Sequence, residues 1–485
     1  FDDVVVGDQR FENQEIFSIS YLADPETPLS GLIGGLGQLV DFYELWLTSL
    51  DRSGVPRVFA AAIDRRLEQV QSAIDRMRAA ILLVESDTNI RDAFRLANYA
   101  MLIQMIHAGL RRKGPFNKDE APTIDVDYLT RKEFRWRPFQ LGFLLLVLAS
   151  TADDTDDFRD LVDVIWFSTG GGKTEAYLLV AAFAMIHRRL EWGEAGCGTA
   201  VMNRYTYRFL TADQFDRTAG LACALERIRW GESRLLDQPF TVGLWVGGEL
   251  TPNRYRHAED RFSELVESVE DAEVKNAFQI ESCPDCGTRL FPSSRIRDPQ
   301  GDDDLAHYGF KAGPTRFVTR CPSKACVFHK SLPVSMVDDE LYARPPSFII
   351  GTIDKFAMLP RVSNAGVFLG FNSGRRPPSL IIQDELHLIS GPLGTLAGIY
   401  EAAIETVIRA QPEGAPPKIL ASTATIRNAA EQCRRLYARK AAVFPSPGLN
   451  SNDSFFARVD ESIERSRMYV GVMGQGVTNT VAVYW

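Results

Sequence analysis

A glycine-rich loop that ends in Lys-Thr holds the residues of this sequence best suited to chemistry. The apolar run Asp163–Phe167 precedes the loop and an amphipathic run follows it, so a strand passes into a helix here. Glycines let backbone N–H groups approach phosphate closely, and a helix N-terminus favours an anion. We expect Lys173 to reach the β and γ phosphates of a nucleotide and Thr174 to ligate Mg²⁺. The loop consists of Ser168, Thr169, Gly170, Gly171, Gly172, Lys173 and Thr174.

A pair of acids follows a second apolar run, Leu380–Gln383. In a parallel sheet the carboxyl ends of the strands meet at one edge, which would place the acids beside the phosphate loop. We expect Asp384 to hold Mg²⁺ through water and Glu385 to act as the general base on an attacking water. A helix N-terminus that favours acids would explain the pair alone. The phosphate loop upstream favours the catalytic interpretation.

Two further elements would complete a nucleotide site. Gln140 precedes the phosphate loop, and its amide can bond both the donor and the acceptor edge of adenine. An ordinary polar helix residue is an equal alternative for this position. Thr423 and Thr425 lie at the end of the predicted strand Lys418–Ser422, where they would couple the γ-phosphate to a nucleic-acid groove. The alternative is a small-residue turn that caps the next helix.

Candidate contacts to a phosphodiester backbone follow two more predicted strands. The strand Thr199–Asn203 leads into an Arg- and Tyr-rich run, and Ser347–Gly351 leads into a Thr and a Lys. Each residue alone would more commonly be a solvated charge or a helix cap. The candidates are Arg204, Tyr205, Thr206, Arg208, Thr352 and Lys355.

Four cysteines form two close pairs in an insert rich in Pro, Asp and Gly. Two thiol pairs on tight turns can supply a tetrahedral site of four sulfurs for a structural Zn²⁺. The wider spacing of the second pair leaves His329 as a possible replacement ligand, although four thiols are favoured. Such an insert is typical of a small folded knob that binds DNA or a partner. The expected ligands are Cys283, Cys286, Cys321 and Cys326.

These residues need a parallel sheet to position them. Six short β-rich runs, the five named above and Thr241–Val246, alternate with amphipathic stretches from about residue 134. This alternation predicts an α/β fold with helices on both faces of a RecA-like sheet. Before that, Val58–Glu85 and Arg91–Arg112 have the apolar spacing of helices. We expect a mainly helical domain at 1–130, the first lobe at 131–278 and 336–440, the zinc insert at 279–335, and the start of a second lobe at 441–485.

Composition limits the class of protein further. The chain has 485 residues and a formal net charge of −9, so bulk charge gives no support for nucleic-acid binding, although a local basic groove can exist in an acidic protein. Its longest apolar runs are too short to span a membrane, and no signal peptide opens it. Close cysteine pairs favour metal binding in a reducing compartment. We therefore expect a cytoplasmic protein without membrane contact.

Taken in order along the chain, these elements resemble the motifs of superfamily two helicases. The elements are the phosphate loop, the Asp-Glu-Leu-His run Asp384–His387, the Ser-Thr-Ala-Thr run Ser422–Thr425 and Gln140. A narrower resemblance, over about residues 134–480, is to the helicase subunit of bacterial DISARM anti-phage systems. It rests on Arg204–Thr211, the cysteine insert and Gln383–Thr395.

The resemblance implies an ATP hydrolase that uses Mg²⁺ to move on, or remodel, single-stranded or partly duplex DNA in phage defence. It also implies a DrmB-type partner subunit. A helicase needs a second RecA-like lobe that supplies an arginine finger. Only Arg467–Met473 resembles the first strand of that lobe, so we expect the chain to be incomplete.

The motifs leave three alternatives open. A duplex translocase that does not separate strands uses the same motor, and an RNA helicase shares the Asp-Glu-x-His form. A nucleotide-gated DNA-binding scaffold would use ATP occupancy as a switch, with turnover incidental. Replacement of the proposed base, Glu385→Gln, would distinguish the scaffold from the motor. A motor should lose its biological activity with this change, whereas a scaffold should keep it.

Overall fold

The computed structural model describes residues 14–167, 170–205, 212–271, 273–423, 428–450 and 453–458. Among them, eight strands form one sheet in the order β10-β1-β9-β8-β2-β7-β3-β6, and every neighbouring pair is parallel. In chain order the strands are β1 (Val162–Trp166), β2 (Val201–Tyr205), β3 (Val242–Trp245), β6 (Val334–Ser335), β7 (Phe348–Thr352), β8 (Leu380–Gln383), β9 (Lys418–Thr423) and β10 (Ala441–Phe444).

Both faces of this sheet are covered, as a parallel sheet with apolar strands requires. Alternate residues of a strand point to opposite faces. In β1, Val164 packs in one apolar cluster and Ile165 in the other, and in β7 Ile349 and Ile350 are divided in the same way. The sheet therefore separates two hydrophobic cores, one under each layer of helices.

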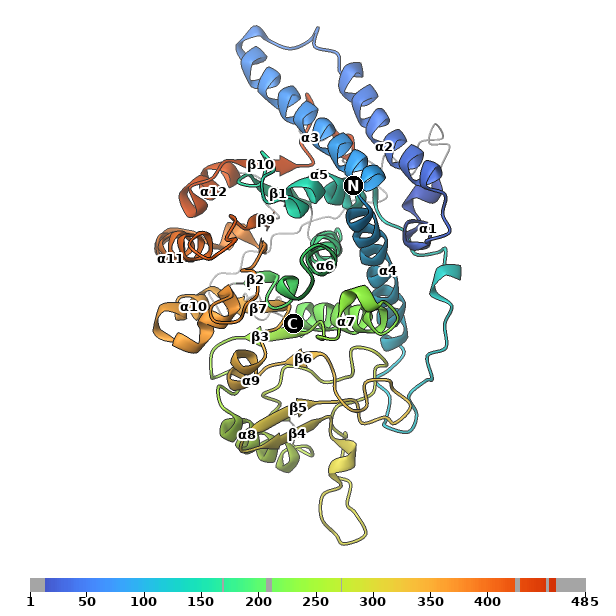
Figure 1. Ribbon diagram of the computed structural model, residues 1–485, viewed down its shortest axis with the longest axis vertical. Coiled ribbons are helices and arrows are strands. Elements are labelled where there is room, and N and C mark those ends of the chain that lie inside the picture. Colours follow the sequence, from blue (N-terminus) through green and yellow to red (C-terminus); the bar gives the residue numbers. More distant parts are fainter. Residues whose placement is uncertain are drawn as a thin grey trace, which may run out of the picture.

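The helices divide between the two faces, as Figure 1 shows. The larger core lies under α3 (Ala60–Ser86), α4 (Thr88–Arg111), α5 (Pro138–Ala152), α6 (Lys173–Trp192) and α7 (Ala212–Arg229). The other face carries α9 (Asp338–Ala343), α10 (Ile353–Phe356), α11 (Gly391–Arg409) and α12 (Ala429–Tyr437).

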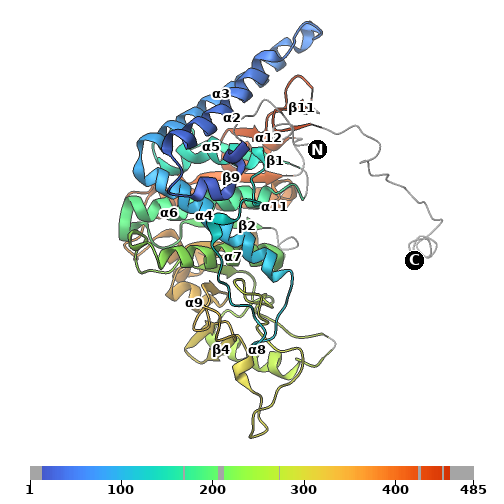
Figure 2. The ribbon, with the colours of Figure 1, turned by 90° about the vertical axis from the view of Figure 1, so that its right-hand side faces the viewer.

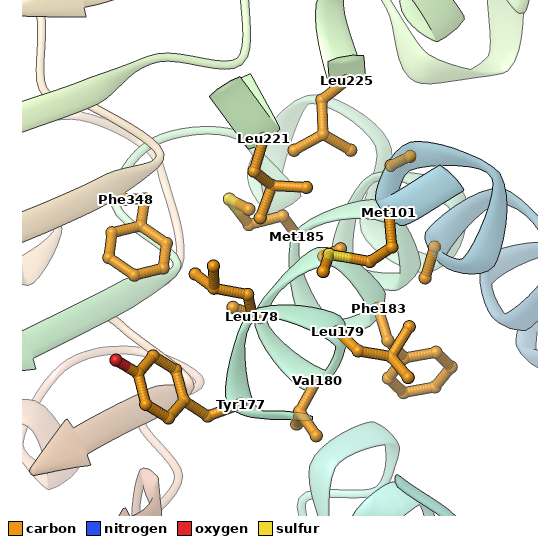
Figure 3. Close-up of a cluster of buried hydrophobic side chains, with 14 of the residues drawn as sticks. Met101, Tyr177, Leu178, Leu179, Val180, Phe183, Met185, Leu221, Leu225 and Phe348 are labelled. Carbon is orange, nitrogen blue, oxygen red and sulfur yellow. The ribbon is translucent and has the colours of Figure 1, made fainter. Parts of the chain in front are cut away.

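Helix α6, which begins at the phosphate loop, is at the centre of the larger core. Figure 3 shows Leu178 and Met185 of α6 facing Leu221 of α7, while Leu179 and Phe183 lie on the side of Met101 of α4. All of these side chains are buried. Packing on several sides fixes the direction of α6 and therefore the position of the loop at its N-terminus.

The N-terminal helices dock on the sheet rather than standing apart from it. Besides α3 and α4 they include α1 (Ile19–Ala23) and α2 (Leu29–Ser49), and α2 and α3 lie side by side and project beyond the sheet in Figures 1 and 2. Arg76 of α3 donates two hydrogen bonds to Asp163 of β1, at 2.8 and 2.7 Å. Lys418 of β9 lies 2.7 Å from the same carboxylate.

Two kinds of element lie at the opposite end of the molecule, in and near the cysteine insert. They are α8 (Tyr255–Glu267) and an antiparallel hairpin of β4 (Phe310–Gly313) and β5 (Arg316–Thr319). A second short hairpin joins β11 (Asp453–Ser454) to β12 (Ala457–Arg458).

The structure confirms the predicted fold class, and each of the six strands predicted from the sequence is present within two residues of its expected bounds. Two domain boundaries differ from the prediction. Strand β6, inside the predicted insert, pairs with β3, and β10, beyond residue 440, pairs with β1, so both belong to the first sheet. Arg467–Met473 lies outside the described residues. No helix within the described ranges is long and apolar enough to cross a membrane.

Candidate nucleotide and metal sites

The described part of the phosphate loop has the geometry that glycine allows. Gly170 and Gly172 have φ angles of +78° and +92°, in the left-handed region that favours glycine. A Cβ atom on Gly172 would lie 2.6 Å from Nε2 of Gln140. Lys173 starts α6, and its Nζ donates to the carbonyl oxygen of Phe167 at 2.6 Å. Ser168 and Thr169 lie outside the described residues.

The acid pair lies at the carboxyl end of β8, as predicted. Asp384 is buried and accepts four hydrogen bonds. Its Oδ1 accepts from the Ser422 hydroxyl and from the backbone N–H of Glu385. Its Oδ2 accepts from the Tyr177 hydroxyl at 3.0 Å and from the Gln214 amide at 3.2 Å. These contacts fix the orientation of the carboxylate.

The three central ionisable groups influence one another. Burial lowers the pKa of Lys173, and the nearby charges of Glu385 and Asp384 oppose that effect. Burial and the negative charge of Asp384 raise the pKa of Glu385, while Lys173 and His387 act in the opposite direction. The structure therefore brings together Lys173, Asp384 and Glu385 from two distant segments of the chain.

A cavity of about 950 Å³ opens beside these residues. Gly170, Lys173 and Thr174 form part of its wall, and Asp384 and Glu385 form another part. The ends of α4 and α7 close a third side with Arg111, Arg112, Asp213, Asp216 and Arg217. The volume suits a nucleotide, because ligand sites commonly measure ~300–1,000 Å³.

Gln140 has partners other than the predicted adenine. Its Oε1 accepts from the backbone N–H of Arg137, and its Nε2 donates to the carbonyl oxygen of Gly172 at 2.9 Å. Arg137, which sequence reasoning missed, donates to the carbonyl oxygen of Gly171 at 2.9 Å. Both side chains thus hold the phosphate loop in place, and adenine recognition by Gln140 stays a prediction.

The predicted γ-phosphate coupling residues lie at the end of β9. The Thr423 hydroxyl is 3.4 Å from Nδ1 of His387, which follows the acid pair. Thr425 lies outside the described residues. Tyr177, Gln214 and Ser422 were not identified from the sequence, because each is an ordinary helix or strand residue until the fold places it against Asp384.

The predicted nucleic-acid contacts have partners inside the protein. Arg204 is fully buried, pairs with Glu401 and lies over the ring of Phe356. The Tyr205 hydroxyl is buried 3.0 Å from that of Tyr177. Arg204 and Tyr205 are therefore buried in this structure, and the predicted contact with a phosphodiester backbone would require them to leave these partners.

The nucleic-acid contacts predicted at and just after the end of strand β7 are also buried or paired within the protein. Thr352 is buried at the start of α10. Lys355 lies 2.7 Å from Asp338 and over the ring of Trp245. Thr206 and Arg208 lie outside the described residues. Nucleic-acid contact by any of these residues stays a prediction, and for Arg204, Tyr205 and Lys355 it requires an exchange of partners.

The four predicted metal ligands do meet. The sulfurs of Cys283, Cys286, Cys321 and Cys326 all lie within 4.8 Å of one another, and the four residues are buried. Two of the distances are 3.9 Å, from Cys283 to Cys326, and 3.5 Å, from Cys286 to Cys321. Sulfurs at ~2.3 Å from a tetrahedral Zn²⁺ are ~3.8 Å apart, so the cluster fits that ion. His329 is not part of this group within the described residues.

Comparison with curated proteins gives one clear relative. The DISARM protein DrmA of Bacillus paralicheniformis (strain ATCC 9945a / NCIMB 11709 / CD-2) is 34% identical over 511 residues, which include 95% of this chain. The chain is similar to DrmA. This confirms the resemblance to DISARM helicase subunits that the motifs indicated. The alignment covers 43% of DrmA, so the chain spans less than half the length of this relative.

The other comparisons add little. No family model matches the chain. Among solved structures, the DUF1998 helicase MrfA aligns with 60% of this chain and 28% of its own, at 12% identity and a TM-score of 0.31. A likeness this weak supports no conclusion about the chain.

Proposed function

We propose that this chain is the nucleotide-binding part of an ATP-driven motor that moves on or remodels DNA in DISARM-type phage defence. The observation that carries the proposal is the meeting of Lys173, Asp384 and Glu385 at one cavity. A flexible cation beside a glycine loop, facing two carboxylates with different surroundings, is suited to phosphoryl transfer to water. The similarity to DrmA supports the DNA and defence part of the proposal.

In this proposal each residue has a distinct role. Lys173 leaves the carbonyl oxygen of Phe167 and binds the terminal phosphates, and Thr174 and Asp384 hold Mg²⁺. The bound ion would neutralise charge on the phosphates. Glu385 accepts a proton from the attacking water, for which its raised pKa suits it. Tyr177, Gln214 and Ser422 orient Asp384 through the hydrogen bonds described above.

The cofactor of the cysteine site is proposed as a structural Zn²⁺. Four buried sulfurs with no open ligand position suit a closed structural site better than a catalytic one. A DrmB-type partner subunit, which the resemblance to DISARM helicase subunits implies, and a cytoplasmic location, which the close cysteine pairs favour, complete the proposal.

The decisive experiment replaces the proposed base. Glu385→Gln is nearly isosteric but cannot accept the proton, so ATP hydrolysis should fall by a factor of ~10²–10⁴ while ATP binding is retained. Cells that carry the defence system with this variant should lose phage protection. Full protection by a hydrolysis-dead Glu385→Gln variant would contradict the motor and favour a nucleotide-gated scaffold.

A further inference from the structure

The first cysteine turn lies against the wall of the nucleotide cavity. Ser282, which immediately precedes the ligand Cys283, lines the cavity together with Arg111 at the end of α4 and Arg217 of α7. The first cysteine turn, the C-terminal end of α4 and the N-terminal end of α7 therefore border the same cavity.

Asp285, between the ligands Cys283 and Cys286, joins this turn to both helices. Its side chain is 1% exposed and accepts two hydrogen bonds from Arg227 of α7, each of 2.8 Å. Nδ1 of His107, on α4, lies 3.0 Å from the carboxylate and 3.0 Å from the carbonyl oxygen of Asp285. A buried carboxylate with paired partners on two helices fixes their relative position.

Backbone contacts reinforce the attachment of α4. Arg111, in its last turn, donates to the carbonyl oxygen of Pro284 in the cysteine turn. The segment after α4 then runs beside the turn. The N–H of Phe116 donates to the carbonyl oxygen of Gly287 at 3.0 Å, and the N–H of Arg289 donates to that of Phe116 at 2.8 Å.

We propose that the four-cysteine metal site fastens α4 and α7 as a wall of the nucleotide cavity, so that metal binding and nucleotide binding strengthen each other. Metal binding is coupled to the folding of the turns that carry its ligands, so removal of the metal would loosen the cysteine turn. The contacts of His107, Arg111 and Arg227 with that turn would then weaken. The role in nucleotide binding rests on the proposed function, whereas the fastening of the two helices does not.

The first test measures a fluorescent ADP analogue binding to the full chain, in zinc-loaded and in chelator-treated, metal-free form. We expect metal removal to weaken binding about tenfold or more, which is within the usual range of coupling between sites. Linkage is reciprocal, so saturating ADP should raise the affinity for Zn²⁺ by the same factor. Equal ADP affinity of the two forms would overturn the inference.

A variant tests whether the contacts of Asp285, rather than the metal ion itself, hold α4 and α7 in place. Asp285→Asn keeps the four thiols but removes the charge that Arg227 and His107 contact. It should retain bound zinc and still bind the ADP analogue about tenfold more weakly. The matched control is Asp303→Asn, in the same insert, where Asp303 pairs with Arg295 at 2.7 Å near the surface and away from the cavity. The control should change neither zinc content nor ADP affinity.

Hydrogen exchange tests the fastening without any nucleotide. Zinc removal, and Asp285→Asn with zinc bound, should both increase amide exchange at residues 107–112 and in α7. Unchanged exchange there in both samples would overturn the inference even if nucleotide binds. Failure of the zinc-loaded protein to bind nucleotide, with the exchange increase present, would instead overturn the proposed function and leave the fastening intact.

Discussion

Asp384 and Glu385 are adjacent in sequence, but the fold gives them different surroundings. Asp384 accepts hydrogen bonds from three side chains and one backbone N–H, which suits a metal ligand of fixed orientation. Glu385 is a quarter exposed, and burial together with the charge of Asp384 raises its pKa. Two carboxylates in such different surroundings can divide the work of metal binding and proton acceptance.

The pKa of Glu385 gives a pH-dependent prediction. Glu385 acts as a base only when ionised, so hydrolysis should fall as the pH drops through its raised pKa. Nδ1 of His387 lies 3.4 Å from the Glu385 carboxylate and lowers its pKa. Replacing that His removes the opposing effect, so the acid limb of the pH–rate profile of His387→Gln should move to higher pH. A limb that stays in place or moves to lower pH would count against Glu385 as the base.

Residue types and spacing were sufficient to predict that Lys173, Asp384 and Glu385 lie together and that the four cysteines meet, because each signature is local. The roles of these residues stay predictions. Arg204 was predicted to contact a phosphodiester backbone, because nothing near it in sequence indicates a buried partner. Its partner Glu401 lies 197 residues further along the chain. Pairing of this kind depends on tertiary packing, which a local pattern does not contain.

At the scale of elements, a buried ionic network joins helix α3 to the sheet. Asp163 is fully buried between Arg76 and Lys418. Burial alone would raise the pKa of Asp163, but the charges of Lys418 and Arg76 outweigh it and hold the pKa below the usual value. Lys418 has a single carboxylate partner here, so burial prevails and lowers its pKa to about 8. Both groups are thus mainly charged at neutral pH.

Breaking this network should destabilise the fold. Arg76→Met keeps much of the side-chain volume but leaves the Asp163 carboxylate with one cationic partner, at an expected cost of about 3–5 kcal/mol in the free energy of unfolding. The control is Arg52→Met, whose partner Asp64 is 3.2 Å away with both side chains more than half exposed. That change should cost less than ~1 kcal/mol. Urea denaturation followed by circular dichroism measures both, and equal effects would contradict the account.

The six predicted strands were recognisable because each is a short, almost wholly apolar run between turn signals. Strands β6 and β10 lie at the two edges of the sheet and were missed. β6 has only two residues, and three of the four residues of β10 are only partly buried, so neither segment is a typical apolar strand. An edge strand is recognised mainly by its pairing with one neighbouring strand. The neighbours of β6 and β10, which are β3 and β1, are distant from them in sequence.

At the scale of the whole molecule, the N-terminal helices and the cysteine insert both pack against the same core as the parallel sheet. Helix α4 packs on α6 and α7, and its C-terminal end contacts the cysteine turn and lines the nucleotide cavity. The sequence predicted these helices from their apolar faces. An apolar face indicates that a helix is covered but not by which element, so the docking could not be predicted.

The proposed function requires that ATP hydrolysis depend on Lys173 and increase when DNA is bound. The most direct test is steady-state ATP hydrolysis by the full-length protein with no nucleic acid, single-stranded DNA, duplex DNA or RNA, beside Lys173→Ala. The account predicts hydrolysis that DNA stimulates, that falls steeply with salt because phosphate contacts dominate, and that disappears in the variant. Hydrolysis that is insensitive to DNA, or that persists in Lys173→Ala, would contradict it.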